Sequence, residues 1–194
     1  MQYFSTNRQS AHVSFGEATL KGQPEDKGLY FPETIPRLSE EFWKDFQTKS
    51  KAQIAFEVIK PFVGDSIDDE KLLNICTETV NFEFPLIKIT ENISTLELFH
   101  GATLAFKDVG ARFMSRCLRY FSQEKSEKTI VIVATSGDTG GAVANGFDGV
   151  EGIEHKMRIH LRLQSAQSCF GQLFINAGEF LFLGFKRLLR LYLF

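Results

Sequence analysis

The chain has 194 residues, 43% of them hydrophobic and 24% charged, a balance typical of a folded globular protein rather than a disordered one. The formal net charge of −2 argues against a dedicated nucleic-acid binder, because such proteins normally carry a basic surplus. Three widely separated cysteines without a C-x-x-C pair argue against a disulfide framework or a structural zinc site, and an N-terminus without a signal-peptide pattern favours a cytoplasmic location.

Residues 1–83 are expected to form a mainly helical segment. Ser14 and Glu17 have the spacing of a capping box, so a short helix should begin there and end before Gly22. The segment 25–36 is rich in glycine and proline and is expected to be extended. Further helix starts are expected at Ser39, at Ser50 with Gln53, and at Ser66, with Pro61 ending or kinking the second of these helices.

From residue 84 the pattern becomes that of an α/β protein. Residues 85–90 and 94–99 read as short strands, and the apolar spacing of residues 108–121 predicts a helix with one buried face. The run KTIVIVAT, residues 128–135, is typical of a strand buried on both faces of a parallel sheet. A glycine-rich turn and another helical pattern follow at once, so we expect an α/β unit with a parallel sheet.

Lys107 stands between Phe106 and the helix that is expected to start near Asp108. Burial of an amine against aromatic rings penalises its charged form, and an uncharged amine can attack an aldehyde. A solvated lysine in a surface turn is the alternative interpretation. Asp108 is a candidate cap for the helix that follows it. His100, close to the same loop, is either a pocket residue or a structural histidine held by a hydrogen bond.

The stretch SGDTGG, residues 136–141, directly follows the predicted buried strand. Such a turn presents backbone N–H groups and a helix N-terminus to an anion, and Ser136 and Thr139 add hydroxyl groups. Because ligands of α/β sheets bind at the carboxyl ends of the strands, we expect a ligand loop here. The stretch matches neither G-x-G-x-x-G nor a Walker loop. The alternative is that its glycines only let the strand and the helix pack closely.

Neither a metal site nor a membrane segment is expected. The four histidines do not lie at zinc-ligand spacing beside cysteines. The apolar stretch 180–194 contains Lys186, Arg187 and Arg190, and it is shorter than the ~20 mostly apolar residues that a membrane-spanning helix needs.

Two stretches taken together resemble the threonine synthase family of the bacterial and fungal type. They are LELFHGATLAFKDVGARFM, residues 96–114, and VATSGDTGGAVANGF, residues 133–147, in the family's order and spacing. The segment EDKGLYFPETIP, residues 25–36, is similar to the family's N-terminal part, and the resemblance covers about residues 1–154. It implies a pyridoxal-phosphate lyase of the tryptophan-synthase β-like fold, which converts O-phosphohomoserine and water to threonine and phosphate.

The resemblance also implies roles for individual residues. Lys107 matches the family lysine that holds the cofactor, pyridoxal 5'-phosphate, and that moves protons at the α and β carbons of the substrate once it is released. Ser136, Gly137, Asp138 and Thr139 match the loop that contacts the cofactor. Within that loop, Ser136 and Thr139 are expected also to contact the carboxylate or phosphate of the substrate.

The chain departs from the family pattern in two places. Ala102 stands where the family usually has proline, which removes no functional group. From about His155 nothing matches, and basic residues outnumber acidic ones in residues 151–194. The later family segments that hold the cofactor phosphate and face its ring nitrogen are not found. We therefore expect the start of the α/β domain in residues 84–154, followed by a divergent tail, 155–194, of a truncated or frame-shifted product.

Two alternatives to an active enzyme stay open at this point. One is a non-catalytic remnant that keeps Lys107 but cannot hold the cofactor. The other is an α/β module that binds a small molecule through Ser136 and Thr139 without catalysis. The two differ from the enzyme in whether an adduct forms at Lys107. The oligomeric state cannot be inferred from the sequence.

Overall fold

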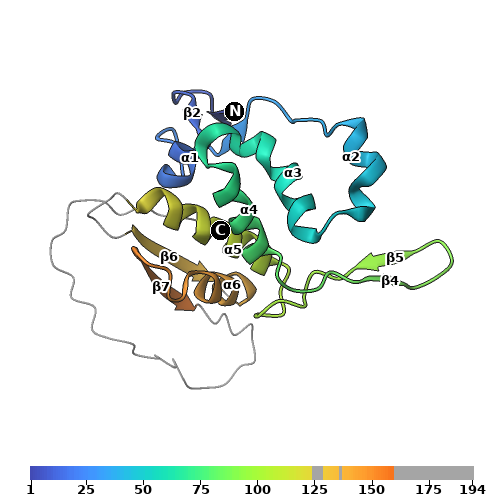
Figure 1. Cartoon of the computed structure of the whole chain (residues 1–194). Coiled ribbons are helices and arrows are strands. Elements are labelled where there is room, and N and C mark those ends of the chain that lie inside the picture. Colours follow the sequence, from blue (N-terminus) through green and yellow to red (C-terminus); the bar gives the residue numbers. More distant parts are fainter. Residues whose placement is uncertain (124–128, 136, 160–194) are drawn as a thin grey trace, which may run out of the picture.

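The computed structural model describes residues 1–123, 129–135 and 137–159 (Figure 1). Within these residues the helices are α1 (Phe15–Lys21), α2 (Glu40–Asp45), α3 (Lys51–Val63), α4 (Asp69–Thr79), α5 (Lys107–Ser122) and α6 (Asp138–Phe147), with 3-10 turns η1 (Phe46–Thr48) and η2 (Gly64–Ser66). The strands are β1 (Gln2–Ser5), β2 (Val13–Ser14), β3 (Tyr30–Pro32), β4 (Leu86–Lys88), β5 (Ser94–Leu96), β6 (Thr129–Thr135) and β7 (Ile153–Ile159). No helix in this described part is both long enough and apolar enough to cross a membrane.

A small antiparallel sheet at the N-terminus, in the order β2-β1-β3, is a feature that the sequence patterns do not predict. Its strands have only two to four residues, too few to show the alternation that identifies a strand in a sequence. Tyr3 of β1 is buried, and its hydroxyl donates a hydrogen bond to the carbonyl of Phe62 at 3.0 Å. This bond attaches the sheet to α3.

The predicted helix starts are confirmed at three serines. Ser14 and Glu17 form a complete capping box at α1, as do Ser50 and Gln53 at α3, and the Ser39 side chain caps α2. In each case a serine oxygen accepts a hydrogen bond from an N–H group that has no partner within the helix.

The other predicted boundaries are less accurate. Helix α3 continues past Pro61 to Val63 and ends at Gly64, whose φ of 61° suits glycine. The last helix of this part begins at Asp69, later than expected, because the 3-10 turn η2 takes up Ser66. The prediction that Pro61 ends the helix is therefore wrong, whereas a kink at Pro61 stays a prediction.

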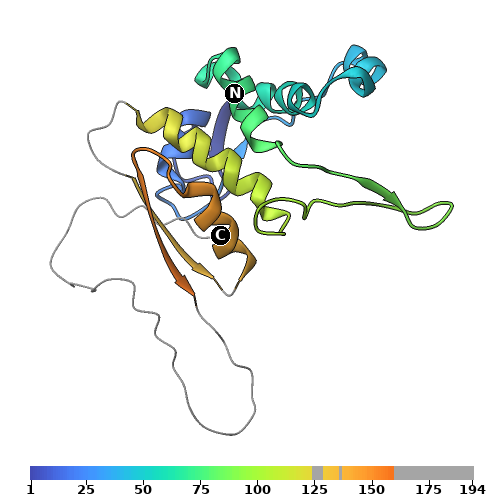
Figure 2. The same ribbon diagram turned by 60° about the horizontal axis from the view of Figure 1, so that its bottom comes forward.

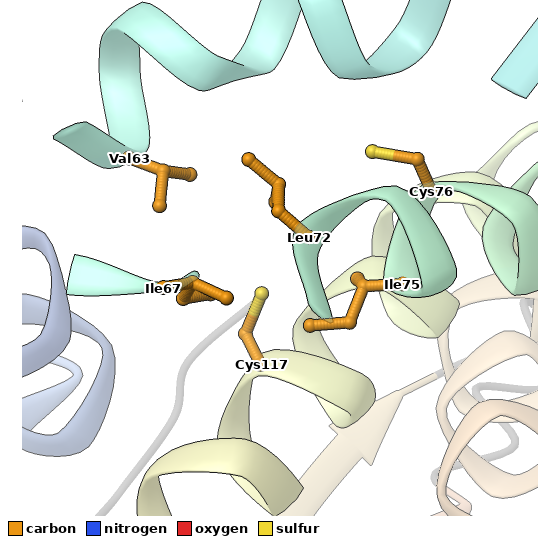
Figure 3. Close-up of a cluster of buried hydrophobic side chains, with 6 residues drawn as sticks. All are labelled: Val63, Ile67, Leu72, Ile75, Cys76 and Cys117. Atoms are coloured by element: carbon orange, nitrogen blue, oxygen red, sulfur yellow. The ribbon is translucent and has the colours of Figure 1, made fainter. Parts of the chain in front are cut away.

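The first core cluster joins α4, α5 and the end of α3 (Figure 3). Its buried members are Val63, Ile67, Leu72, Ile75, Cys76 and Cys117. At its edge the rings of Phe15 and Phe121 pack with their centroids 6.1 Å apart. Full burial of one large aliphatic side chain contributes roughly 1.5–3 kcal/mol, so this cluster holds the N-terminal helices firmly on α5.

Strands β6 and β7 pair in parallel and are joined through α6, which confirms the predicted parallel α/β unit (Figures 1 and 2). A second core cluster places α5 and α6 on one face of this pair. Its buried members are Leu118, Val131, Val133, Val143 and Phe147. Ile130 and Ile132 alternate with the buried valines and are only partly buried. The prediction of a strand buried on both faces is therefore wrong for the part that the structure describes.

Strands β4 and β5, predicted as short strands, form an antiparallel hairpin that extends away from the helices (Figure 2). All of their residues are exposed, including Leu86 and Leu96. An isolated two-stranded hairpin is only marginally stable in water. The hairpin therefore adds little to the core, although the chain that follows it leads directly to Lys107.

The backbone continues the sheet across the domain boundary expected between residues 154 and 155, because β7 spans that position. The division of the chain at residues 83 and 154 stays a prediction. Most of the expected divergent tail, residues 160–194, lies outside the described residues.

Candidate active site

Lys107 and the glycine-rich stretch, two candidates far apart in the sequence, lie in contact. Lys107 is the first residue of α5, and its Nζ donates a hydrogen bond to Oγ1 of Thr139 at 2.6 Å. Thr139 lies in the first turn of α6, so the contact joins the N-terminal ends of two helices. A solvated lysine in an ordinary surface turn would not be held by a side chain 32 positions away.

The surroundings of Lys107 are unusual for a cation. The partial positive charge at a helix N-terminus favours anions, yet α5 begins with a lysine. Lys107 is half-buried, and among the described residues no carboxylate forms an ion pair with it. Its Nζ also lies 5.9 Å from the centroid of the Phe106 ring. The amine thus lies beside two helix N-termini and has no counterion in the part of the chain that the structure describes, an arrangement suited to an anionic ligand.

The turn after β6 is organised by Thr135, a residue that the sequence analysis did not select. Its Oγ1 accepts hydrogen bonds from the N–H groups of Gly137, at 3.2 Å, and Gly140, at 3.3 Å. Two donors of the expected anion loop are therefore already engaged with this hydroxyl. The position of Thr135, last in the strand and just before a glycine turn, is the signal that could have identified it. Of the predicted loop residues, Ser136 lies outside the described residues.

The other predicted residues of this turn lie at the start of α6. Gly137 occupies the N-cap position with extended backbone, and Asp138 is the first helical residue. Both are exposed, whereas Thr139 is half-buried against Lys107. The structure thus brings Thr139 to the amine directly and places Gly137 and Asp138 on the open side of the same turn.

The sequence predicts Asp108 as a cap of α5, but the structure shows that its side chain does not cap this helix. Its own N–H donates to the carbonyl of Ala105 at 3.1 Å, which places it inside the first turn. Its carboxylate instead turns back to the preceding loop and accepts hydrogen bonds from the backbone N–H of Thr103, at 2.8 Å, and from the Thr103 hydroxyl. Asp108 is only 1% exposed. Sequence reasoning missed Thr103, because its role depends on a loop conformation that no pattern specifies.

His100 is held by contacts within its own segment, as one of the two interpretations predicts. Its Nε2 lies 2.6 Å from a carboxylate oxygen of Glu97, and its ring stacks on Phe99 with a centroid distance of 4.7 Å. In the described part of the chain, no group of three or more metal-ligating side chains comes together.

A surface hollow of about 650 Å³ lies on the N-terminal sheet, away from Lys107. Its lining includes Phe4, Arg8, His12, Phe31 and Glu33. Neither the loop before α5 nor the turn after β6 contributes to it. We therefore build the candidate site on the Lys107–Thr139 contact rather than on this hollow.

Comparison with known proteins finds relatives that match most of this chain, including the residues of the candidate site. The family model described as "Threonine synthase N terminus" matches residues 2–80. Threonine synthase of Buchnera aphidicola subsp. Baizongia pistaciae is 37% identical over 153 residues, which are 76% of this chain and 34% of that protein. Threonine synthase of Escherichia coli (strain K12) is 35% identical over 159 residues, which are 79% of this chain and 36% of that protein.

A solved structure shows the same fold. The crystal structure of PLP-bound threonine synthase from Brucella melitensis superposes with a TM-score of 0.77 at 34% identity, covering 81% of this chain and 35% of that chain. The chain thus spans about a third of the length of the relatives that it matches. The expected fold class, an incomplete tryptophan-synthase β-like α/β fold, is confirmed. The part of this chain that the comparisons cover is therefore similar to the N-terminal third of threonine synthases.

Proposed function

We propose that this chain carries the cofactor lysine and part of the substrate loop of a cytoplasmic, pyridoxal-phosphate-dependent threonine synthase. The reaction is the conversion of O-phosphohomoserine and water to threonine and phosphate. The observation that carries the proposal is the 2.6 Å hydrogen bond from Lys107 Nζ to Thr139 Oγ1. It joins the two stretches whose combination is specific to the family. Since the chain spans about a third of its relatives' length, these residues supply one part of a larger site.

The residues present fit a cofactor that has an aldehyde and a negative charge. Lys107 offers a half-buried primary amine without a counterion among the described residues. The N-terminal ends of α5 and α6, which meet at this amine, favour an anionic group. When bound, pyridoxal phosphate supplies a ring that takes up the electrons of a substrate carbanion.

The protein groups of the site have separate tasks in this proposal. The Lys107 amine binds the cofactor aldehyde and, once displaced by substrate, takes and returns protons at the α and β carbons. Thr139, which accepts the hydrogen bond from Nζ, orients that amine. Gly137, Asp138 and Thr139 contact the cofactor. Ser136, together with Thr139, binds the carboxylate or phosphate of the substrate.

The experiment that tests the proposal is reductive trapping. The full chain is mixed with pyridoxal phosphate, reduced with borohydride, digested and analysed by peptide mass spectrometry. We expect a phosphopyridoxyl group on Lys107 in preference to the exposed Lys88, and a visible absorption band before reduction that is lost in Lys107→Ala. Lys107→Arg should behave as Lys107→Ala does, because a guanidinium keeps the charge but cannot form the adduct.

Two outcomes would favour the alternatives. Equal labelling of Lys107 and Lys88 would show that the chain lacks a selective cofactor site. Phosphate or amino-acid binding that survives Lys107→Ala but is lost in Thr139→Val would identify a binding module without catalysis. Lys88→Ala is the matched control, since it removes an exposed lysine of β4 and should leave the band unchanged.

A further inference from the structure

The loop that precedes Lys107 is folded back onto the first turn of α5. Within it, the N–H of Leu104 donates to the carbonyl of Gly101 at 3.2 Å, and Leu104 has a φ of 56° although it is not glycine. Gly101 lies so close to the helix that a Cβ at this position would be 2.4 Å from Oδ2 of Asp108. The loop therefore has no space to move toward the helix, and a side chain at residue 101 would displace the Asp108 carboxylate.

Asp108 is the group that holds this loop. It is 1% exposed, and among the described residues no lysine, arginine or histidine forms an ion pair with it. A buried carboxylate without a cation needs hydrogen-bond donors to offset the loss of water. Thr103 supplies two of them, its backbone N–H at 2.8 Å and its hydroxyl. Breaking this pair would leave a buried charge with too few donors.

Thr103 also faces Gly141 of α6, on the other side of the site. A Cβ added to Gly141 would lie 3.8 Å from Cβ of Thr103, in ordinary van der Waals contact. Gly141 is in the first turn of α6, beside Thr139. The N-terminal ends of α5 and α6 are thus linked by the hydrogen bond from Lys107 to Thr139, and Thr103, which the Asp108 carboxylate holds, faces Gly141 near that link.

We infer that Asp108 and Thr103 are positioning residues, which set the distance between the Lys107 amine and the turn that holds Thr139. The inference deepens the proposed function and depends on it for the chemistry at Lys107. Asp108 and Thr103 act on the neighbouring lysine by fixing the loop that precedes it against the first turn of α5, with Thr103 facing the start of α6.

The test compares Thr103→Val with Thr103→Ser in the full chain, using pyridoxal phosphate trapping as the first readout. Thr103→Val removes the hydroxyl donor at nearly constant shape, whereas Thr103→Ser keeps it. We expect the ratio of trapped Lys107 to trapped Lys88 to fall about tenfold in Thr103→Val, the effect of losing one hydrogen bond to a charged group. Thr103→Ser should restore the ratio, which a general loss of packing would not do.

A second readout separates this inference from the proposed function. Without cofactor, acetic anhydride labels free amines, and Thr103→Val should raise the acetylation of Lys107 relative to Lys88, because the amine is released from Thr139. If wild type shows no preference for Lys107 in trapping, the proposed function fails, and acetylation alone decides the inference. Unchanged acetylation of Lys107 in Thr103→Val, or no recovery in Thr103→Ser, would overturn it.

Asp108→Asn provides an independent variant in case Thr103→Val does not fold. Asparagine keeps one oxygen acceptor for the two Thr103 donors and removes the charge, so the shift in the Lys107 to Lys88 ratio should have the same sign and be smaller. Thr77→Val is the matched control, because the Thr77 hydroxyl bonds only to its own helix, at the carbonyl of Leu73. Equal shifts in Thr77→Val and Thr103→Val would count against a specific role.

Discussion

Lys107 donates a hydrogen bond from Nζ to Oγ1 of Thr139 at 2.6 Å, and this bond connects the first turns of α5 and α6. Its position explains why a cation stands at a helix N-terminus, where the helix dipole opposes it. In the proposed function the lysine is needed there for its amine, which is held against a second helix start that also favours anions. An anionic ligand would supply the counterion that Lys107 does not have among the described residues.

Thr139→Val is expected to weaken the selectivity of trapping at Lys107. The substitution removes the acceptor of the Nζ hydrogen bond at nearly constant shape, and bonds to charged groups contribute about 1.5–3 kcal/mol. A loss of this size corresponds to a drop of about tenfold or more in the ratio of trapped Lys107 to trapped Lys88. Peptide mass spectrometry after borohydride reduction measures the ratio, and Thr139→Ser should recover most of it. A wild-type ratio in Thr139→Val would show that the bond does not orient the amine.

Gly146→Ala should destabilise the chain, because α5 and α6 cross at this residue. An added Cβ would lie 3.0 Å from the carbonyl carbon and 3.1 Å from the carbonyl oxygen of Ala111, both backbone atoms that cannot easily move. Overpacking of this kind costs about 1–3 kcal/mol, to be measured as a lower free energy of unfolding in urea.

Gly110→Ala is the matched control for that substitution. Gly110 lies on the exposed side of α5, and nothing lies within 4 Å of an added Cβ there. The same chemical change should therefore stabilise the chain by about 0.5–1 kcal/mol, through the lower entropy of its unfolded state. Opposite signs for the two variants would confirm the close approach at Gly146, and equal effects would contradict it.

The elements that could be predicted from the sequence are those with strong local signals. Serine caps such as Ser14 and Ser50 identify helix starts because the cap and its partner lie within four residues. The apolar run of β6 and the glycine turn after it predict the α/β unit for the same reason. The sequence does not predict the strands of the N-terminal sheet, because they pair with distant segments and are too short to show an alternation of apolar and polar residues.

In the candidate site, too, the sequence predicts the residues with local patterns and misses those whose roles depend on tertiary contacts. The two sequence stretches predict Lys107 and Thr139 as site residues, and the structure adds the hydrogen bond between them. The roles of Thr135 and Thr103 arise from hydrogen bonds across turns, which depend on loop geometry rather than on residue spacing. The expectation for Asp108 is wrong because acidic residues near a helix start usually cap it, whereas here Thr103 of the preceding loop donates to the carboxylate instead.

Asp26 should make the stability of the N-terminal sheet depend on acid pH. Its carboxylate accepts hydrogen bonds from Ser5 Oγ at 2.6 Å and from the N–H groups of Gln9 at 2.9 Å and Gly28 at 3.0 Å. Desolvation acts to raise its pKa, but these bonds outweigh it and lower the pKa from 3.8 to about 2. A lowered pKa means that the ionised group stabilises the folded state above the unfolded pKa, and that this contribution is lost as the pH falls from about 4 to about 2.

The measurement is the free energy of unfolding of wild type and Asp26→Asn across that pH window. The difference between them should be constant above about pH 4 and shrink as the pH approaches 2. Asp148→Asn alters an exposed carboxylate outside this network and should leave the pH dependence of the wild type unchanged. A difference between wild type and Asp26→Asn that does not change with pH would contradict the assigned hydrogen bonds.

Cys76 and Cys117 should be unreactive in the folded chain. Both are 1% exposed in the cluster between α4 and α5. Burial raises the pKa of the Cys76 thiol to about 11, and burial together with the nearby Cys76 raises that of Cys117 further. Because the thiolate is the nucleophile, neither should react at pH 8 with a disulfide reagent until the chain unfolds. The test uses a Cys169→Ser background, so that only these two thiols are counted. In denaturant, both thiols should react. Without denaturant, they should react only as fast as the chain unfolds. Rapid reaction of either thiol in the folded chain would show that the α4–α5 packing opens readily.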